Sequence, residues 1–217
     1  QKSHILMSYI QQNLNKIKSQ LPSNVTLVAV SKTKPVEDLM EAYNAGQRIF
    51  GENKIQEMTE KWQQMPKDIE WHMIGHVQSN KVKYMVPYVK LIHGVDSLKL
   101  LKEINRQAAR WRKNINCLLQ IHIAEEETKF GLDENELIEL LNSDEFKEMN
   151  NIKVIGLMGM ATFTDNQEQI KKEFDYLKSI FDKYQTLQTP NFKLQTLSMG
   201  MSGDYQLAID CGSTMVR

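Results

Sequence analysis

Short apolar runs alternate with amphipathic segments along the whole chain. Residues 25–30 are apolar without regular polar alternation and are rich in β-branched side chains, which is typical of a strand buried on both faces. Residues 5–17 carry apolar side chains at intervals of three and four and predict an amphipathic helix before that strand. Further strands are predicted near residues 47–53, 71–76, 91–96, 117–123, 154–160, 196–202 and 213–217.

Helical patterns separate these strands. Pro35 ends the first strand and a helical pattern follows at once, Ser97 is a predicted N-cap, and Asp133 with Glu136 forms a predicted capping box. Eight strands alternating with helices predict an α/β fold, a single-domain TIM (β/α)8 barrel over residues 1–217. The length of 217 residues suits a compact barrel of this kind.

Composition and charge indicate which partners and which cellular compartment to expect. Lys plus Arg and Asp plus Glu both number 27, so the formal net charge is zero and we expect neither nucleic acid nor a membrane as partner. Cys117 and Cys211 lie far apart in the sequence and are expected to be buried free thiols in a reducing compartment. With no signal-peptide pattern in residues 1–20 and no run of eighteen apolar residues, we expect a cytoplasmic protein.

Lys32 is the first candidate for chemistry. It follows the first strand directly, and the carboxyl ends of parallel strands are where α/β folds place their reactive groups. Desolvation against the apolar run would lower the pKa of Lys32 and free its amine to attack a carbonyl carbon. The alternative is an ordinary solvated loop charge, which is what we expect of Lys34.

Other candidate site residues converge on the same rim of the predicted barrel. The strand ends bring together Lys32, Asn53, His76, Asp96, Met160, the loop 198–202 and Arg217. An amine, a Ser- and Gly-rich loop and an arginine suit a phosphorylated carbonyl compound, because N–H groups and hydroxyls of the loop can bind a phosphate. The same loop also reads as a plain turn.

Two other kinds of site are not expected. His72 and His76 share a predicted strand face but would stand about 13 Å apart at roughly 3.3 Å per residue, too far for one metal ion. The glycine fingerprint of a dinucleotide site and the G-x-S-x-G motif of a nucleophile elbow are both absent from the sequence.

Several unusual sequence strings identify a resemblance. The strings are Ala-Val-Ser-Lys-Thr-Lys-Pro (29–35), Phe-Gly-Glu-Asn (50–53), Trp-His-Met-Ile-Gly-His (71–76) with Gln78, Asn80 and Lys81, Gly-Leu-Met-Gly-Met (156–160), Leu-Ser-Met-Gly-Met-Ser (197–202) and Gly-Ser-Thr-Met-Val-Arg (212–217). In this order, over nearly the whole chain, they closely resemble the pyridoxal phosphate homeostasis protein family. The resemblance implies an alanine racemase N-terminal-domain-like barrel that binds pyridoxal 5′-phosphate (PLP), takes part in vitamin B6 homeostasis and has no established catalytic activity.

Site residues carry over motif by motif. The resemblance implies that Lys32 forms a Schiff base with the PLP aldehyde, that Ser198 and Ser202 lie at the phosphate, and that Arg217 faces the pyridine nitrogen. Asn53, His76 and Met160 would line the pocket. The family continues beyond the arginine with Ile-Gly-Thr and a closing helix, so we expect the C-terminal end of this domain to be incomplete.

A holder of PLP fits these residues better than a catalyst. An arginine does not give up its proton at neutral pH, so opposite the ring nitrogen it leaves the pyridine unprotonated and a poor electron sink. We therefore expect a protein that is not an enzyme. We also expect a monomer, with PLP and PLP-dependent apoenzymes as its partners. Two alternatives stay open: a fold-type III PLP enzyme such as an amino-acid racemase or decarboxylase, and a barrel aldolase using Lys32 on a sugar phosphate.

Overall fold

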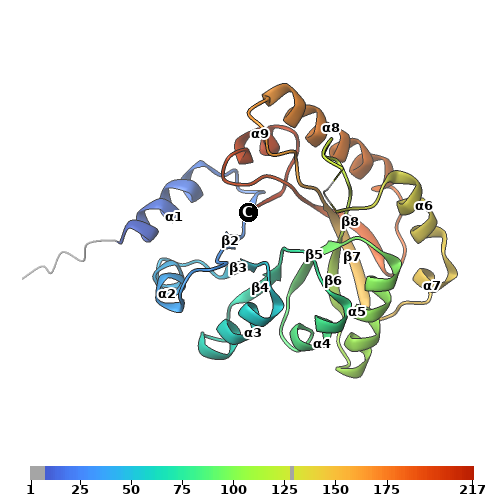
Figure 1. The fold of residues 1–217 in the computed structure, drawn as a ribbon, viewed down its shortest axis with the longest axis horizontal. Coiled ribbons are helices and arrows are strands. Elements are labelled where there is room, and N and C mark those ends of the chain that lie inside the picture. The colour runs from blue at the N-terminus through green and yellow to red at the C-terminus, as the bar shows by residue number, and fades with distance from the viewer. Residues whose placement is uncertain (1–7, 128–129) are drawn as a thin grey trace, which may run out of the picture.

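Parallel strands form a nearly closed barrel with helices on its outside (Figure 1). The computed structural model describes residues 8–127 and 130–217. All neighbouring strands are parallel, in the order β1-β9-β8-β7-β6-β5-β4-β3-β2. The first two, β1 (Thr26–Leu27) and β2 (Ala29–Val30), are halves of one strand on either side of Val28. One half pairs with the last strand and the other with the next strand, which joins the two edges and confirms the predicted eight-stranded barrel.

The remaining elements follow the predicted alternation. The other strands are β3 (Ile49–Glu52), β4 (Glu70–Met73), β5 (Leu91–Val95), β6 (Ile115–Gln120), β7 (Ile152–Met158), β8 (Phe192–Ser198) and β9 (Met215–Val216). The helices are α1 (Tyr9–Gln20), α2 (Val36–Asn44), α3 (Ile55–Gln64), η1 (Ser79–Lys81, a 3-10 turn), α4 (Val82–Met85), α5 (Leu98–Arg110), α6 (Glu134–Asn142), α7 (Asp144–Lys147), α8 (Gln167–Tyr184) and α9 (Tyr205–Asp210). The part of the predicted first helix that falls on residues 5–7 lies outside the described residues.

Helix starts are set by the capping residues that the sequence indicates. The Ser97 hydroxyl accepts from the backbone N–H of Leu100 at 3.0 Å. Asp133 and Glu136 form the expected capping box of α6, with reciprocal bonds of 2.8 and 3.0 Å. These bonds satisfy N–H groups that the first helical turn leaves without partners.

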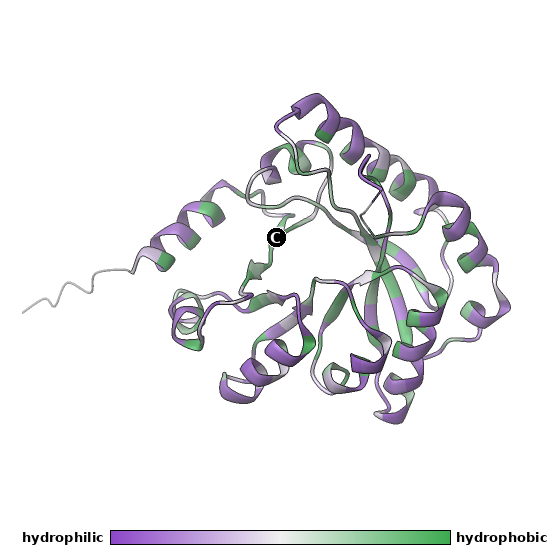
Figure 2. Cartoon of the chain, viewed as in Figure 1, coloured by the Kyte–Doolittle hydropathy of each residue, from purple (hydrophilic) through white to green (hydrophobic). Residues whose placement is uncertain are grey.

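The core has two layers, one on each side of the sheet. A small apolar cluster fills the barrel interior and includes Val28, Leu118 and Met158. A larger cluster lies between the strands and the helices, whose outer faces are polar (Figure 2). Both cysteines are buried, as expected. None of the described helices is long and apolar enough to cross a membrane.

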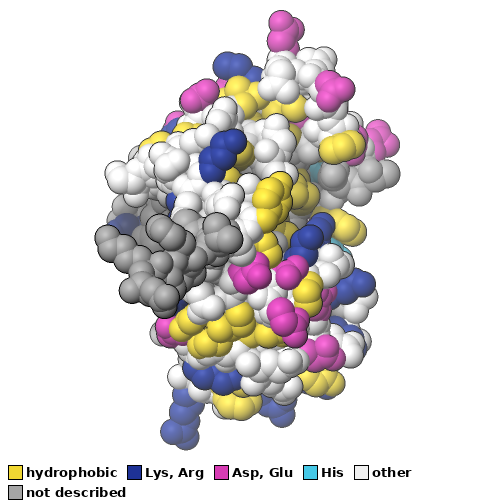
Figure 3. Space-filling view, turned by 90° about the vertical axis from the view of Figure 1, so that its left-hand side faces the viewer, with side chains coloured by type: hydrophobic (Ala, Val, Ile, Leu, Met, Phe, Trp, Pro, Cys, Tyr) yellow, Lys and Arg dark blue, Asp and Glu magenta, His cyan; other side chains and the backbone are white. Residues whose placement is uncertain are grey.

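The first strand is less buried than its sequence predicts. Within residues 25–30 only Val28 is fully buried, and the rest are half-buried. The physical reason is a groove of about 810 Å³ bordered by α1, α2, α9 and this strand. Figure 3 looks at this side of the molecule, where hydrophobic side chains are visible among charged ones. The prediction of a strand covered on both faces is therefore wrong.

Gly156 in β7 is a position where the barrel has no room for a side chain. A Cβ there would overlap the backbone carbonyl oxygen of Thr196 on β8, and a backbone atom in a sheet cannot move aside easily. We expect Gly156→Ala to lower the free energy of unfolding by about 2 kcal/mol or more. Urea denaturation measures this change.

Gly203→Ala is the matched control. A Cβ at Gly203 meets no atom within 4 Å and the residue has no positive φ, so we expect its effect to stay within about 0.5 kcal/mol. Equal stabilities of the Gly156→Ala variant and the wild type would contradict the packing described for β7 and β8.

Candidate functional site

A pocket of about 300 Å³ lies at the carboxyl ends of the strands. Its lining joins residues from distant parts of the chain: Val30, Lys32, Asn53, Ile74, Gly75, His76, Gln120, Phe130, Met160, Met201 and Arg217. Five of the seven predicted cofactor-binding residues are among them: Lys32, Asn53, His76, Met160 and Arg217. The groove beside α1 shares Val30, Lys32, Met201 and Arg217 with this pocket, so the two spaces adjoin.

Lys32 lies in the turn that follows β2. Its side chain is exposed, so the expected desolvation against the apolar run is absent from the structure. The cause is the same as for the half-buried strand, since the outer groove reaches this rim. Lys34 is also exposed; it lines the groove and is not among the residues that line the smaller pocket.

Arg217 brings a buried positive charge to the pocket. The side chain is buried, one terminal N–H group donates to the carbonyl of Gly159 at 3.3 Å, and Nε has no partner among the described residues. Burial lowers the pKa of Arg217 to about 10, which leaves the guanidinium charged at neutral pH. A buried donor without a partner is costly, and a ligand with an acceptor atom would satisfy it.

His76 lies beyond the end of β4, at the mouth of the pocket. Its ring stacks on Phe130 with centroids 3.9 Å apart and planes inclined by 12°. Its Nδ1 is 3.7 Å from a carboxylate oxygen of Asp96. Burial raises the pKa of Asp96. The stacked rings of His76 and Phe130 give this wall of the pocket a flat aromatic surface, and the Asp96 carboxylate lies next to it.

The two predicted phosphate serines occupy different places. Ser202 lines the groove, together with Lys32 and Arg217. Ser198 is fully buried at the end of β8, and its hydroxyl lies 3.0 Å from Nδ1 of His93. In the turn that joins them, the N–H of Met201 donates to the Asp204 carboxylate at 2.6 Å, an arrangement typical of an ordinary turn.

A buried chain of polar groups crosses the barrel interior beneath the pocket. Nδ1 of His72 lies 2.9 Å from Nε2 of His93, whose other ring nitrogen contacts Ser198. Burial, and then the charge of Lys90, lower the pKa of His72 to about 3. Burial lowers the pKa of His93 well below its usual value, with smaller contributions from His72 and Arg217. Both rings are therefore neutral, and a neutral imidazole has one nitrogen that donates and one that accepts. His93 uses both of its nitrogens, one toward His72 and one toward Ser198.

Sequence reasoning missed several pocket residues. Gln120 ends a buried strand, so its polar side chain was a usable signal; its amide donates to the carbonyl of Phe130 at 3.2 Å. Phe130 and Met201 come from loops, where no pattern predicts the direction of a side chain. No group of three or more His, Cys, Asp or Glu side chains that could hold a metal occurs within residues 8–127 and 130–217.

Comparisons with known proteins agree on one family. The model of the alanine racemase N-terminal domain matches residues 5–217. The pyridoxal phosphate homeostasis protein of Pasteurella multocida is 38% identical over 217 residues, covering 97% of this chain and 92% of that protein. The protein of the same name from Schizosaccharomyces pombe is 39% identical over 219 residues, covering 97% and 90%.

Solved structures give the same picture. PipY of Synechococcus elongatus, solved without PLP, superposes with a TM-score of 0.89 at 34% identity, covering 96% of both chains. The structure of PipY with PLP bound superposes with a TM-score of 0.86. Alanine racemase from E. faecalis has a TM-score of 0.74 at 15% identity and covers 96% of this chain but 55% of its own, which shows a shared fold.

The two buried histidines make stability depend on pH. An unfolded histidine has a pKa near 6.5, and folding lowers the pKa of both, so the unfolded state binds more protons in acid. The free energy of unfolding should therefore fall as the pH drops below about 6.5. For His72 the loss continues until the pH reaches its folded pKa of about 3.

His72→Gln tests this origin of the pH dependence. Removing one such histidine should reduce the loss of stability between pH 7 and pH 5 by about 2 kcal/mol, the value for one group that titrates near 6.5 when unfolded. Urea denaturation of both proteins at the two pH values measures the difference. The same pH dependence in variant and wild type would show that His72 is not buried in its neutral form.

Proposed function

Because the chain belongs to the pyridoxal phosphate homeostasis protein family, we propose that it binds PLP in the pocket at the strand ends and holds it as a Schiff base on Lys32. The observation that carries this proposal is one pocket lined by an amine on a turn and a buried guanidinium without a full set of partners. The amine can attack the aldehyde carbon, so that a C=N bond forms and one water leaves. The guanidinium offers an N–H group to an acceptor atom of the same ligand.

We assign Arg217 to the pyridine nitrogen. Its Nε has no partner among the described residues, and a ring nitrogen with a free lone pair is an acceptor that fits it. An arginine keeps its proton, so it leaves the ring nitrogen unprotonated and does not strengthen the cofactor as an electron sink. Asn53, His76 and Met160 complete the wall around the ring.

The phosphate is assigned to the side where the pocket meets the groove. Ser202 lines the groove next to Lys32 and Arg217, and its hydroxyl can donate to a phosphate oxygen. Ser198 is fully buried and its hydroxyl is hydrogen-bonded to His93, so it contributes to this end of the pocket only indirectly. We therefore place the direct contact at Ser202 and an indirect one at Ser198.

The biological role proposed here is the holding and release of PLP. We take residues 1–217 as one PLP-binding domain that acts as a monomer and passes PLP to PLP-dependent apoenzymes. Two buried thiols fit a protein of the reducing cytoplasm. The likeness to alanine racemases covers the barrel and 55% of the E. faecalis enzyme, so the fold alone is compatible with catalysis as well. We propose that this chain binds PLP without catalysing a reaction.

Lys32→Ala should abolish covalent binding of PLP. Wild-type protein mixed with PLP is expected to gain the visible absorbance of a protonated imine, and mass spectrometry after borohydride reduction is expected to locate one pyridoxyl group on Lys32. Lys34→Ala is the control and should keep the absorbance. A wild type that stays colourless and unmodified with PLP would refute the proposed function.

The absence of catalysis can be tested by hydrogen exchange. We expect the PLP-loaded protein to exchange the α-hydrogen of alanine and other amino acids with deuterium from the solvent no faster than free PLP does, because nothing assigned to the ring nitrogen supplies a proton. Mass spectrometry of the amino acids follows the exchange. A rate well above that of free PLP would favour the racemase alternative.

A further inference from the structure

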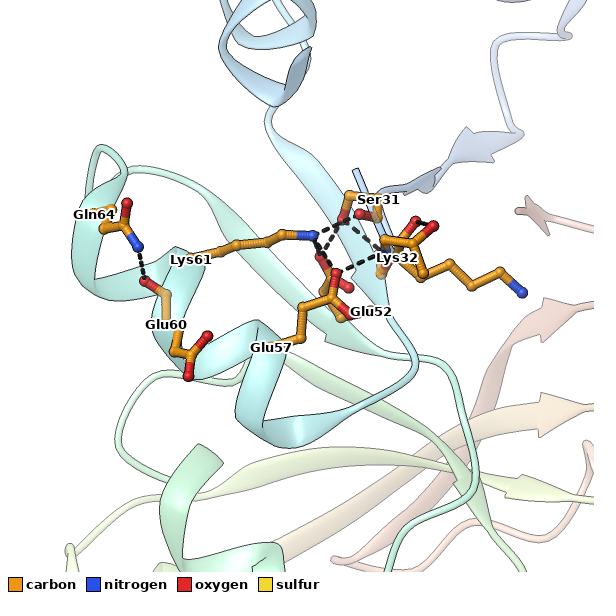
Figure 4. A network of polar contacts seen from close by, with 9 residues as sticks. Ser31, Lys32, Glu52, Glu57, Glu60, Lys61 and Gln64 are labelled. Carbon is orange, nitrogen blue, oxygen red and sulfur yellow. Dashed lines mark hydrogen bonds and ion pairs between the residues drawn. The ribbon is translucent and has the colours of Figure 1, made fainter. Parts of the chain in front are cut away.

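The turn that carries Lys32 is tied to helix α3 by a buried ionic cluster, defined here as Ser31, Glu52, Glu57 and Lys61 (Figure 4). We propose that Glu57 and Lys61 are positioning residues that fix the main chain on both sides of Lys32 and so select this amine over Lys34 for the carbonyl ligand. The inference rests on the proposed function and adds to it the origin of the choice between two neighbouring lysines.

Lys61 is the centre of the cluster. Its side chain is buried, and Nζ contacts one oxygen of Glu52 at 2.5 Å and one of Glu57 at 2.7 Å. Nζ also donates to the backbone carbonyl of Ser31 at 2.6 Å. An ammonium group has three N–H donors, so all three are engaged. Charge-assisted hydrogen bonds of this kind fix the position of the Lys61 ammonium group. Because that group also binds the Ser31 carbonyl, it fixes the backbone just before Lys32.

The residue before Lys32 is held by two further bonds. The N–H of Ser31 donates to the carbonyl of Gly51 at 3.0 Å, which continues the pairing of β2 with β3. The Ser31 hydroxyl donates to Glu52 at 2.8 Å. Ser31 is itself buried, so these groups have no competing water.

The residue after Lys32 is held by Glu57. Thr33 has a φ of 61°, in the left-handed region that a β-branched residue rarely occupies. Its backbone N–H donates to the Glu57 carboxylate at 2.7 Å. This charge-assisted bond holds a conformation that the residue would otherwise leave, and it fixes the direction in which the chain exits Lys32.

The side chain of Lys32 points away from this cluster. Figure 4 shows Lys61 reaching the turn from one side while Lys32 extends to the other. Lys32 lines the pocket with Arg217, whereas Lys34 lines the outer groove. The amines of Lys32 and Lys34 are both exposed and only two residues apart, so exposure alone does not explain why one of them would react in preference to the other. The backbone conformation at residues 31–33 decides which amine reaches the pocket. The cluster holds that conformation together with the bond from the Lys34 N–H to the Ser31 carbonyl at 3.2 Å.

The test replaces Glu57, which is only partly buried, instead of the buried Lys61. Glu57→Ala deletes the acceptor of the Thr33 N–H, and Glu57→Asp keeps the charge on a side chain too short to reach it. Each protein is incubated with PLP and reduced with borohydride, and peptide mapping gives the ratio of adduct on Lys32 to adduct on Lys34. In both variants we expect this ratio to fall roughly tenfold, which corresponds to about 1.4 kcal/mol and to one hydrogen bond to a charged group.

Two matched variants separate positioning from a general effect on the helix. Glu57→Gln keeps an oxygen that can accept the Thr33 N–H, so it should restore most of the wild-type ratio. Glu60→Ala removes an exposed carboxylate from the same helix. The Glu60 carboxylate accepts a hydrogen bond from the Gln56 amide at 3.5 Å and does not contact the cluster, so this variant should leave the ratio unchanged. Circular dichroism confirms that each variant is folded at the temperature of the labelling.

The outcomes are distinct. A folded Glu57→Asp or Glu57→Ala protein with the wild-type ratio overturns the positioning role while leaving PLP binding intact. A fall of the ratio in Glu60→Ala as large as in Glu57→Ala also overturns it. A wild type that forms no adduct on either lysine overturns the proposed function, and with it this inference.

Discussion

Backbone pairing between the first and the last strand is the constraint on which the site depends. Leu27 lies in register with Val216, and the N–H of Val28 donates to the carbonyl of Val216 at 2.9 Å. Two residues further along the split strand, Val30 pairs with Gly51 on β3. Because one short strand joins both edges of the sheet, the turn after it and the residue after β9 come to the same rim. Lys32 and Arg217 line one pocket for this reason, although almost the entire chain separates them in sequence.

Much of the fold follows from patterns that are local in sequence. Apolar runs mark the strands, and capping residues such as Ser97 mark the helix starts, because both depend on neighbouring residues alone. The direction of a polar side chain at a strand end cannot be predicted in the same way. Side chains alternate between the two faces of a strand, so the direction depends on the register of the whole strand. The register between β6 and β7 shifts at Cys117 and Leu118, and that between β7 and β8 shifts between Val154 and Gly156. Such irregularities cannot be predicted from one sequence, and they change which face of the sheet the following side chains point to.

The barrel interior shows how polar groups are accommodated beneath a binding pocket. His72 and His93 would be costly to bury with unsatisfied nitrogens, yet each makes at least one hydrogen bond in a chain that ends at Ser198. Neutral imidazoles are suited to this place because a charged one would face the guanidinium of Arg217, which already disfavours protonation of His93. The interior thus leaves the pocket with one fixed buried cation instead of several titrating ones.

The exposure of Lys32 bears on the difference between holding a cofactor and using it. A catalyst gains from excluding water, because electrostatic interactions strengthen and imine bonds to the cofactor are protected from hydrolysis. Here the amine is exposed and its pocket adjoins an open groove beside α1. Water can reach an imine formed at such a position, reverse the condensation and regenerate the free aldehyde. In the proposed function this is an advantage, since a protein that stores PLP must also release it. The buried cluster around Lys61 then has a clear physical role: it keeps the attachment point fixed while the ligand bound there comes and goes.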